Sequence, residues 1–236
     1  MTLQALIWDV DGTLAETEDD GHRVAFNLAF DEAGLPWHWD SARYADLLAV
    51  TGGKERLRAW WQGIDPRAAD AAGAAETIRH LHARKTAHYI GLLAHGGIAL
   101  RPGVADLLAQ AHAAGVRQAI ATSTTLDNVL QLIDVTLGQG GRGLFACIGA
   151  GDVVAHKKPA PDIYHWVLDQ LGLPAADCLA IEDSVPGVLA ARGAALPVLL
   201  VRSRYTGTVR IEGAVADLPS LHGTDLHALR HWHRQA

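Results

Sequence analysis

The chain of 236 residues has little cysteine and no long apolar stretch. Its two cysteines, Cys147 and Cys178, each lie in an apolar run typical of a buried strand. Neither has metal-ligand spacing around it, so the pattern favours two reduced core thiols over a disulfide or a metal site. No apolar segment approaches the length of a transmembrane helix, and no signal-peptide pattern follows the initiating methionine. We therefore expect a cytoplasmic protein without a membrane partner.

An excess of positive charge is also missing. Lysine and arginine number 20 against 26 aspartates and glutamates, which gives a net charge of −6. Nucleic-acid-binding proteins usually carry a basic surface, so we expect no nucleic-acid partner. The hydrophobic content of 49% suffices for an ordinary globular core. The length suits one domain with a sizeable insert, or two small domains, and we expect a monomer.

Short apolar runs alternate with helical patterns over most of the chain. The runs predict buried parallel strands at residues 5–8, 118–121, 145–148, 178–181 and 197–201. The helical patterns cover residues 102–114, 126–137, 162–171 and 186–193. This alternation predicts an α/β fold with a Rossmann-like, doubly wound parallel sheet, in which ligands bind at the carboxyl ends of the strands.

Residues 16–92 differ from the rest, because helical stretches dominate and no strand-like run lies beside them. These stretches cover residues 19–32, 41–50, 55–62 and 68–94. We therefore predict a core made of residues 1–15 and 93–236, interrupted by an all-helical inserted domain.

Two carboxylates follow the first predicted strand. Asp9 and Asp11 would point to the same side if the extended geometry continued, and Gly12 allows a sharp turn with backbone N–H groups open to a phosphate. A bare pair of this kind is usually a solvated surface turn. The strand before it and Thr13-Leu14 after it favour a functional loop.

Three further strand-end or loop motifs accompany this pair. Glu182 and Asp183 would crowd negative charge at the same sheet edge and favour Mg²⁺, although an acidic helix cap explains them as well. The hydroxyls of Thr122, Ser123 and Thr124 could bind phosphate oxygens or merely cap a helix. Lys158 precedes a proline-stiffened turn, where it could neutralise a phosphoryl group or simply be exposed. The ordered set predicts more than any member alone.

This ordered set resembles the signature of the haloacid dehalogenase superfamily, whose members mostly transfer phosphoryl groups. The resemblance implies that Asp9 is a nucleophile forming an aspartyl-phosphate and that Asp11 is the general acid and base. It implies that Thr122 and Lys158 hold the phosphoryl oxygens. The aspartate at position 11 is the pattern of phosphatases and phosphomutases rather than dehalogenases.

The same resemblance implies a magnesium site and a mobile helical cap. The metal ligands would be Asp9, the backbone carbonyl of Asp11, and Asp183, with Glu182 in support. The helical insert resembles the cap of the CbbY-type phosphatases, which dephosphorylate xylulose-1,5-bisphosphate. Its expected substrate-binding residues are Glu18, His22, Thr51, Gly52, Gly53, Lys54, Arg56 and Lys85. Lys54, Arg56 and Lys85 could equally form an ordinary basic helix face.

The leading hypothesis is therefore a Mg²⁺-dependent sugar-phosphate phosphatase that acts on a small phosphorylated sugar, xylulose-1,5-bisphosphate. The alternatives are a phosphomutase of the β-phosphoglucomutase kind and a phosphoglycolate phosphatase. A non-catalytic binding protein on the same scaffold is disfavoured, because Asp9, Asp11, Lys158 and Asp183 are all present.

Overall fold

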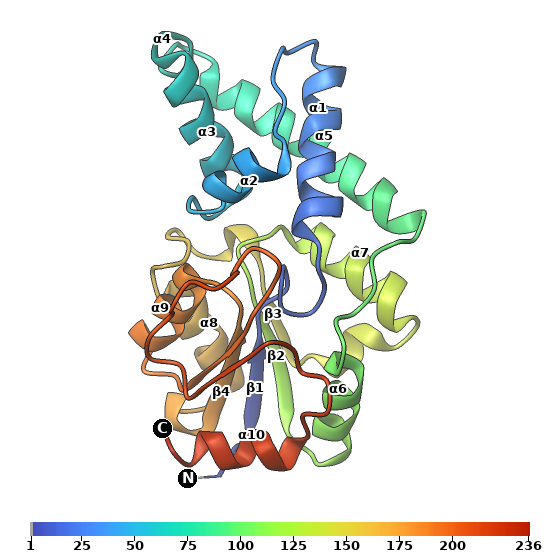
Figure 1. Cartoon of the computed structure of the whole chain (residues 1–236), viewed down its shortest axis with the longest axis vertical. Helices are drawn as coiled ribbons and strands as arrows, with labels where there is room; N and C mark the ends of the chain where they lie inside the picture. Colours follow the sequence, from blue (N-terminus) through green and yellow to red (C-terminus); the bar gives the residue numbers. More distant parts are fainter. Residues whose placement is uncertain (1) are drawn as a thin grey trace. The chain divides into compact units, whose positions relative to one another are not determined.

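The computed structural model describes residues 2–236, which form two compact units (Figure 1). The core unit contains the chain up to Glu16 together with Ala99–Ala236, and the helical unit contains Thr17–Ile98. The boundaries differ by a few residues from the sequence-based ones, because the last helix of the helical unit continues through Ala94 and the chain returns only after a turn at Gly96 and Gly97.

A six-stranded parallel sheet forms the centre of the core unit, in the order β3-β2-β1-β4-β5-β6. The strands are β1 (Ala5–Trp8), β2 (Arg117–Ala121), β3 (Cys147–Gly149), β4 (Cys178–Glu182), β5 (Val198–Val201) and β6 (Ala216–Leu218). The predicted doubly wound α/β fold is confirmed. The third strand begins two residues later than predicted, because Phe145 still closes a 3-10 turn onto Arg142.

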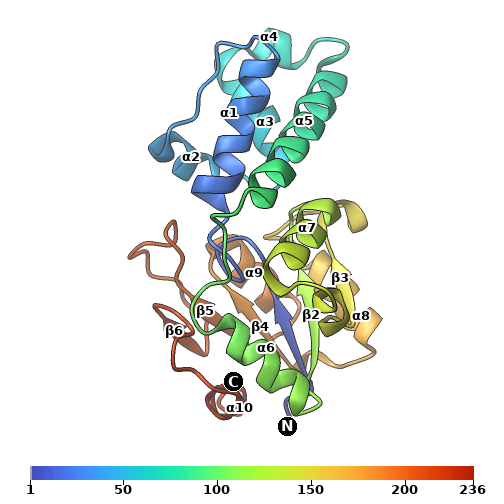
Figure 2. The same ribbon diagram turned by 90° about the vertical axis from the view of Figure 1, so that its right-hand side faces the viewer.

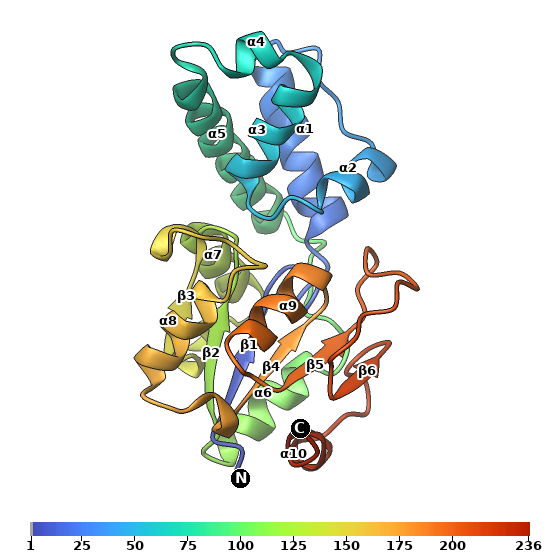
Figure 3. The same cartoon turned by 90° about the vertical axis from the view of Figure 1, so that its left-hand side faces the viewer.

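Helices cover both faces of this sheet (Figure 2). One face carries α6 (Val104–Ala113) and α7 (Leu126–Leu137), and the other carries α8 (Asp162–Leu171) and α9 (Val185–Gly193), as Figure 3 also shows. Alternate strand residues account for the two faces. Ala5 and Ile7 pack with the α8 and α9 side, whereas the buried Gln118 donates to the carbonyl of Leu108 in α6. Short 3-10 turns span Gly141–Leu144, Gly151–Val153 and Ala175–Asp177.

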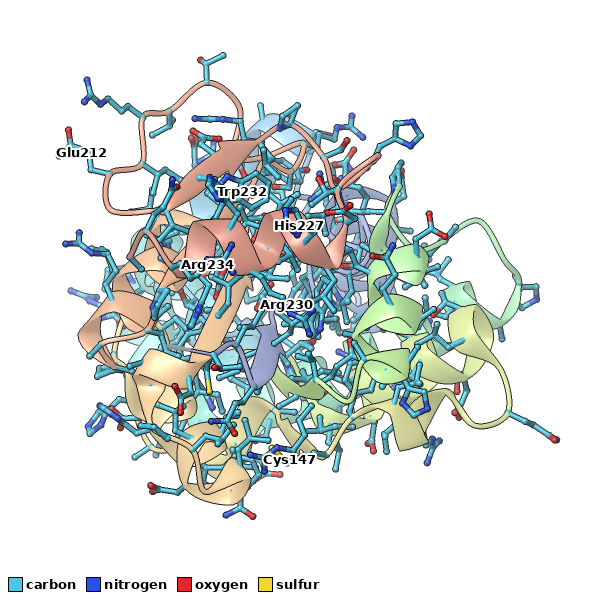
Figure 4. The ribbon with its side chains drawn as sticks, turned by 90° about the horizontal axis from the view of Figure 1, so that it is seen from below. Cys147, Glu212, His227, Arg230, Trp232 and Arg234 are labelled. Atoms are coloured by element: carbon cyan, nitrogen blue, oxygen red, sulfur yellow. The ribbon has the colours of Figure 1, made fainter. Side chains whose placement is uncertain are left out.

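The last helix, α10 (Leu226–His233), packs against α6 and was not predicted from the sequence. Figure 4 shows it from below with the side chains of His227, Arg230, Trp232 and Arg234. Cys147, labelled in the same view, begins β3 at the amino end of the sheet. Cys147 is half-buried, Cys178 is buried and both are free thiols, as expected.

The helical unit has no strand among its described elements. A π-helical turn (Glu18–Arg23) leads into α1 (Val24–Glu32), followed by α2 (Ser41–Leu47), α3 (Gly53–Ile64), α4 (Pro66–Ala69) and α5 (Ala74–Ala94). The single helix predicted over residues 68–94 is wrong, because Gly73 takes a φ of 99° and interrupts it. Aromatic rings fill the interior, with the ring of Trp39 4.7 Å from Phe26 and 4.9 Å from Phe30. None of the helices within residues 2–236 is both long and apolar enough to span a membrane.

Two chain segments of the core unit lead into and out of the insert side by side. Ala15 forms an antiparallel bridge with Leu100, and the amide of Arg101 donates to the carbonyl of Leu14 at 2.8 Å. The insert therefore begins and ends at one place in the core.

Candidate active site

The parallel ladder brings the predicted site residues to one edge of the sheet. The amide of Asp9 donates to Ile181 at 3.0 Å and that of Thr122 to Gly149 at 2.9 Å, so the strand pairing continues one residue past the end of β1 and β2. Glu182 is the last residue of β4, with Asp183 directly after it. The backbones of these residues are held in place because each strand is hydrogen-bonded to the strand beside it.

Lys158 enters this edge from the loop before α8, and its ammonium joins the acids. Its Nζ lies 2.7 Å from Asp9 Oδ1, 2.6 Å from Glu182 Oε1 and 2.9 Å from the carbonyl oxygen of Ala121. The residue is 5% exposed. An ammonium has three N–H donors, so these three acceptors occupy all of them. The interpretation of Lys158 as an ordinary exposed lysine is wrong.

The burial of this cluster shifts its ionisation. Burial raises the pKa of Asp9 well above its usual range, and the charges of Glu182 and Asp183 raise it further, while Lys158 opposes them. Burial lowers the pKa of Lys158, but the neighbouring carboxylates of Asp9 and Glu182 outweigh it, so the net pKa lies above its usual value. Lys158 is therefore held as a cation by the carboxylates of Asp9 and Glu182, with which it forms ion pairs.

The three acids fit a divalent metal ion. Asp9, Glu182 and Asp183 each offer a carboxylate oxygen, and these oxygens lie within 4.8 Å of one another. A buried, oxygen-only set with an uncompensated negative charge is the kind of site that Mg²⁺ prefers. Gly12 shapes this set, because at a φ of 82° a Cβ there would lie 2.2 Å from Asp183 Oδ2. Asp11 lies in the same loop and is half-buried.

The Glu182 carboxylate is held from one side. Its Oε1 accepts from Lys158 at 2.6 Å and from the hydroxyl of Tyr164 at 2.5 Å. Its Oε2 is buried and has no hydrogen-bond partner among the described residues. Oε2 faces Gly187 so closely that a Cβ there would lie 1.8 Å away. The sequence did not single out Tyr164, because its position in α8 matches an ordinary core face.

Polar groups also gather where β2 leads into α7. Thr122 is 2% exposed, and its Oγ1 accepts from the amide of Thr124 at 3.3 Å. The buried Asn128 donates through Nδ2 to Thr124 Oγ1 at 3.0 Å. Ser123 and Thr124 are half-buried at the start of the twelve-residue α7. The amino end of this helix can accept an anion. Asn128 was missed, because a single polar residue in the first turn of a helix matches an ordinary exposed helix face.

Arg101, which the sequence also did not reveal, holds the loop after β1. Its guanidinium donates to the carbonyls of Gly12 and Arg202, reaches that of Val201 at 3.4 Å, and pairs with Glu16 at 3.1 Å. It thus ties the loop that carries Asp9 and Asp11 to the end of β5.

The residues predicted to bind substrate in the helical unit fall into two connected groups. In the first, the Tyr44 hydroxyl donates to Glu18 Oε2 at 2.6 Å and accepts from Arg56 Nη1 at 2.8 Å. Arg56 Nε also donates to the carbonyls of Leu47 and Val50, at 3.2 and 3.3 Å. Arg56 is buried, so much of its donor capacity serves the helical unit itself.

The second group surrounds Lys85, which is 3% exposed. Its Nζ donates to Nδ1 of His22 at 2.7 Å and lies 5.1 Å from the ring centres of Phe26 and Tyr89. Such ring faces attract a buried cation. The half-buried Thr51 and Lys54 flank the glycine pair of the intervening loop. Gly53 is needed there, because a Cβ would lie 2.4 Å from Nε2 of His82.

The fold and the strand-end site define a class of enzyme. The model of the haloacid dehalogenase-like hydrolases matches residues 3–195, and the chain belongs to this family. It is accordingly a phosphatase that carries the family's fold.

Within that class the chain is similar to CbbY proteins. It is 47% identical to the plasmid protein CbbY of Cupriavidus necator, over 98% of this chain and 97% of the relative. The crystal structure of CbbY from Rhodobacter sphaeroides in complex with phosphate matches with a TM-score of 0.89 and 43% identity, over 97% of this chain and 99% of that one. An aspartate-to-asparagine mutant of the same protein, in complex with xylulose-1,5-bisphosphate, matches equally well. The chain is a phosphatase of the CbbY type.

Proposed function

We propose that the chain is a Mg²⁺-dependent sugar-phosphate phosphatase that hydrolyses xylulose-1,5-bisphosphate to xylulose 5-phosphate through a phosphorylated Asp9. The observation that carries this proposal is the strand-end cluster, in which Asp9 is paired with Lys158 beside two further buried carboxylates. A carboxylate attacks a phosphate dianion only when the charge between them is neutralised. Mg²⁺, held by Asp9, the carbonyl of Asp11, Asp183 and the supporting Glu182, would supply that neutralisation.

The chain's own residues perform the remaining steps. Asp9 forms a bond from its carboxylate oxygen to phosphorus, and the bond from phosphorus to the sugar oxygen breaks. Asp11 gives its proton to the leaving sugar oxygen and then takes one from the water that attacks the aspartyl-phosphate, which releases inorganic phosphate and restores Asp9. Thr122 and the neighbouring Ser123 and Thr124 donate to the phosphoryl oxygens. Fixed alignment of these groups accounts for much of the acceleration.

Lys158 has to change partners during this reaction. All three of its donors are taken by protein acceptors, so contact with a phosphoryl oxygen requires it to release one of them. Asp9 is the partner that changes chemically, because its carboxylate becomes an acyl phosphate. The contact from Lys158 to Asp9 is therefore the one that passes to the phosphoryl group.

The helical unit is proposed to act as a cap that recognises the second phosphate. Its buried cations Arg56 and Lys85, with His22 and the half-buried Lys54, offer positive charge and N–H donors to an anion. Glu18 and the loop from Thr51 to Gly53 would complete this side of the substrate site. The complex of xylulose-1,5-bisphosphate with the Rhodobacter sphaeroides protein supports the choice of a bisphosphorylated ketose. A cytoplasmic location and a monomeric state stay predictions.

Phosphate release in the presence of Mg²⁺ tests this proposal across xylulose-1,5-bisphosphate, phosphoglycolate and β-glucose-1-phosphate, with isomerisation of the last measured in parallel. We expect kcat/KM to be highest for the bisphosphate. Isomerisation as the fastest reaction would make the protein a mutase, and preference for phosphoglycolate would remove the role of the cap cations. The Asp9→Asn variant should release no phosphate from any of them, and surviving turnover would refute the covalent route.

A further inference from the structure

The Glu182 carboxylate that anchors Lys158 depends on few contacts. Lys158 and Tyr164 both donate to its Oε1, while Oε2 has no partner among the described residues. Oε2 also cannot turn toward α9, because the backbone of Gly187 already lies against it. The orientation of this buried carboxylate therefore depends on the two donors at a single oxygen.

Tyr164 touches both members of this pair. Its hydroxyl reaches Glu182 Oε1 at 2.5 Å, and the face of its ring lies 5.3 Å from Nζ of Lys158. The residue is fully buried in α8, so its position is set by packing rather than by solvent. One side chain thus contacts the cation through its ring and the anion through its hydroxyl.

We infer that Tyr164 is a positioning residue for phosphoryl transfer, which acts on Lys158 directly through its ring and indirectly through Glu182. The inference rests on the proposed role of Lys158 at the phosphoryl group. When Lys158 releases Asp9, its remaining protein acceptors are the carbonyl of Ala121 and Glu182 Oε1. A hydroxyl that donates to Oε1 shares the charge of that oxygen and weakens its hold on the ammonium. The ring of Tyr164 packs against the ammonium of Lys158 and limits its movement when the Glu182 carboxylate shifts.

The Tyr164→Phe variant tests the hydroxyl alone, because phenylalanine keeps the ring and its packing. We expect kcat with para-nitrophenyl phosphate and Mg²⁺ to fall about tenfold, since one hydrogen bond to a buried charged group is removed. KM should change less than twofold, since Tyr164 does not touch the substrate. Tyr164→Leu removes the ring as well and should lower kcat further. Ile163→Val, a buried and purely apolar neighbour in α8, is the matched control and should keep the kcat of the wild type.

A spectroscopic measurement separates positioning from loss of stability. The chain has only four lysines, at positions 54, 85, 157 and 158, so ¹⁵N-lysine labelling gives a simple ammonium spectrum. Lys158 is buried with three protein acceptors, so its ammonium should give a slowly exchanging signal. This signal is assigned to Lys158 because it should be missing from the spectrum of a Lys158→Arg variant. We expect Tyr164→Phe to move this signal in the metal-free protein and to leave that of the buried Lys85, in the helical unit, in place. Ile163→Val should move neither.

Two results overturn the inference. One is a Tyr164→Phe enzyme with the kcat of the Ile163→Val control, and the other is an unmoved Lys158 signal in a folded Tyr164→Phe protein. Failure of the proposed function gives a different pattern, in which the wild type and Asp9→Asn release phosphate alike. In that case a shifted Lys158 signal would still report the contact between Tyr164 and the Lys158 site.

Discussion

The two units bury charge of opposite sign. At the sheet edge of the core unit, Asp9, Glu182 and Asp183 outnumber Lys158, so the site is acidic. In the helical unit two cationic side chains, Arg56 and Lys85, are buried together with one acidic side chain, Asp19. The interior of this unit is therefore basic. An acidic interior suits a cation and a basic one suits an anion. The proposed metal-assisted phosphatase of a bisphosphorylated sugar would need both.

The two units also support their charges differently. The core fixes each acid at the end of a strand whose backbone is paired on both sides. The helical unit holds its cations largely through side chains: Lys85 lies near the rings of Phe26 and Tyr89, and Arg56 donates to the hydroxyl of Tyr44 as well as to two backbone carbonyls. Backbone pairing does not change when a side chain is substituted, whereas side-chain support does. We therefore expect the substrate preference to change with fewer substitutions than the chemistry.

The largest effect is expected where the strand-end site loses the lysine that pairs with its acids. Lys158→Met leaves the carboxylates of Asp9 and Glu182 buried without their cationic partner, which should lower the free energy of unfolding by about 3–5 kcal/mol and reduce kcat roughly a thousandfold. Urea unfolding and steady-state kinetics measure the two effects. The control is Lys157→Met, whose lysine pairs with the exposed Asp152 at 3.1 Å and should contribute less than about 1 kcal/mol. Equal losses in the two variants would show that burial of Lys158 has no special role.

The acidity of the core site predicts a response to metal. Burial raises the pKa of Asp9 in the folded protein, so its stabilising contribution is present below about pH 4, the ordinary pKa, and is lost as the pH rises through the raised value. At pH 7.5 the metal-free protein should therefore be less stable. Mg²⁺ at about 100 times its Kd should add roughly 2.7 kcal/mol to the free energy of unfolding, or several degrees to Tm.

Asp183→Asn tests this response by differential scanning fluorimetry. Removing one carboxylate should raise the Tm of the metal-free protein and abolish the increase with Mg²⁺. Asp169→Asn, an exposed acid in α8, should keep the full increase. If Asp183→Asn kept it too, the acidic cluster would not be the metal site.

In the helical unit a smaller effect should separate binding from chemistry. Lys54→Ala should raise KM for xylulose-1,5-bisphosphate about tenfold and leave hydrolysis of para-nitrophenyl phosphate unchanged, because only the former has a second phosphate. Lys54 is a cleaner choice than Arg56, whose bonds to Tyr44, Leu47 and Val50 also support the fold. Arg58→Ala, an exposed cation in the same helix, serves as the control. Equal losses on both substrates would remove Lys54 from the phosphate site.

The last prediction leaves activity aside and concerns a probe that reports on the core alone, since both cysteines belong to it. Burial raises the pKa of Cys147 to about 11 and that of Cys178 to about 12. Alkylation of Cys147 by iodoacetamide at pH 8 should therefore be slower than that of free cysteine by about two orders of magnitude, and should rise about tenfold per pH unit. Mass spectrometry of the labelled protein measures the rates. Labelling at the rate of free cysteine would contradict the burial of β3.

Sequence reasoning reached the core more fully than the helical unit. Apolar runs that end in acids or hydroxyls locate β1, β2 and β4 and the residues after them. This works because the burial of a central strand is visible in a few consecutive residues of the sequence. The short, half-polar β6 and the polar α10 carry no such run. Tyr164 and Arg101 escaped detection, because their partners lie in other segments of the chain. Asn128 escaped because a single polar residue in the first turn of α7 matches an ordinary exposed helix face. The interruption of the helix at Gly73 could be recognised only from the positive φ that this residue takes in the structure.

The bridge between Ala15 and Leu100 has a consequence for how such a chain folds and diversifies. Because the two ends of the insert meet, β1 and β2 can pair whatever lies between them, and the entropy lost in closing that loop grows only with the logarithm of its length. The insert can lengthen, shrink or be exchanged without displacing a strand. With the helical unit in its proposed role, a phosphatase built this way would acquire a new substrate through replacement of a single inserted segment.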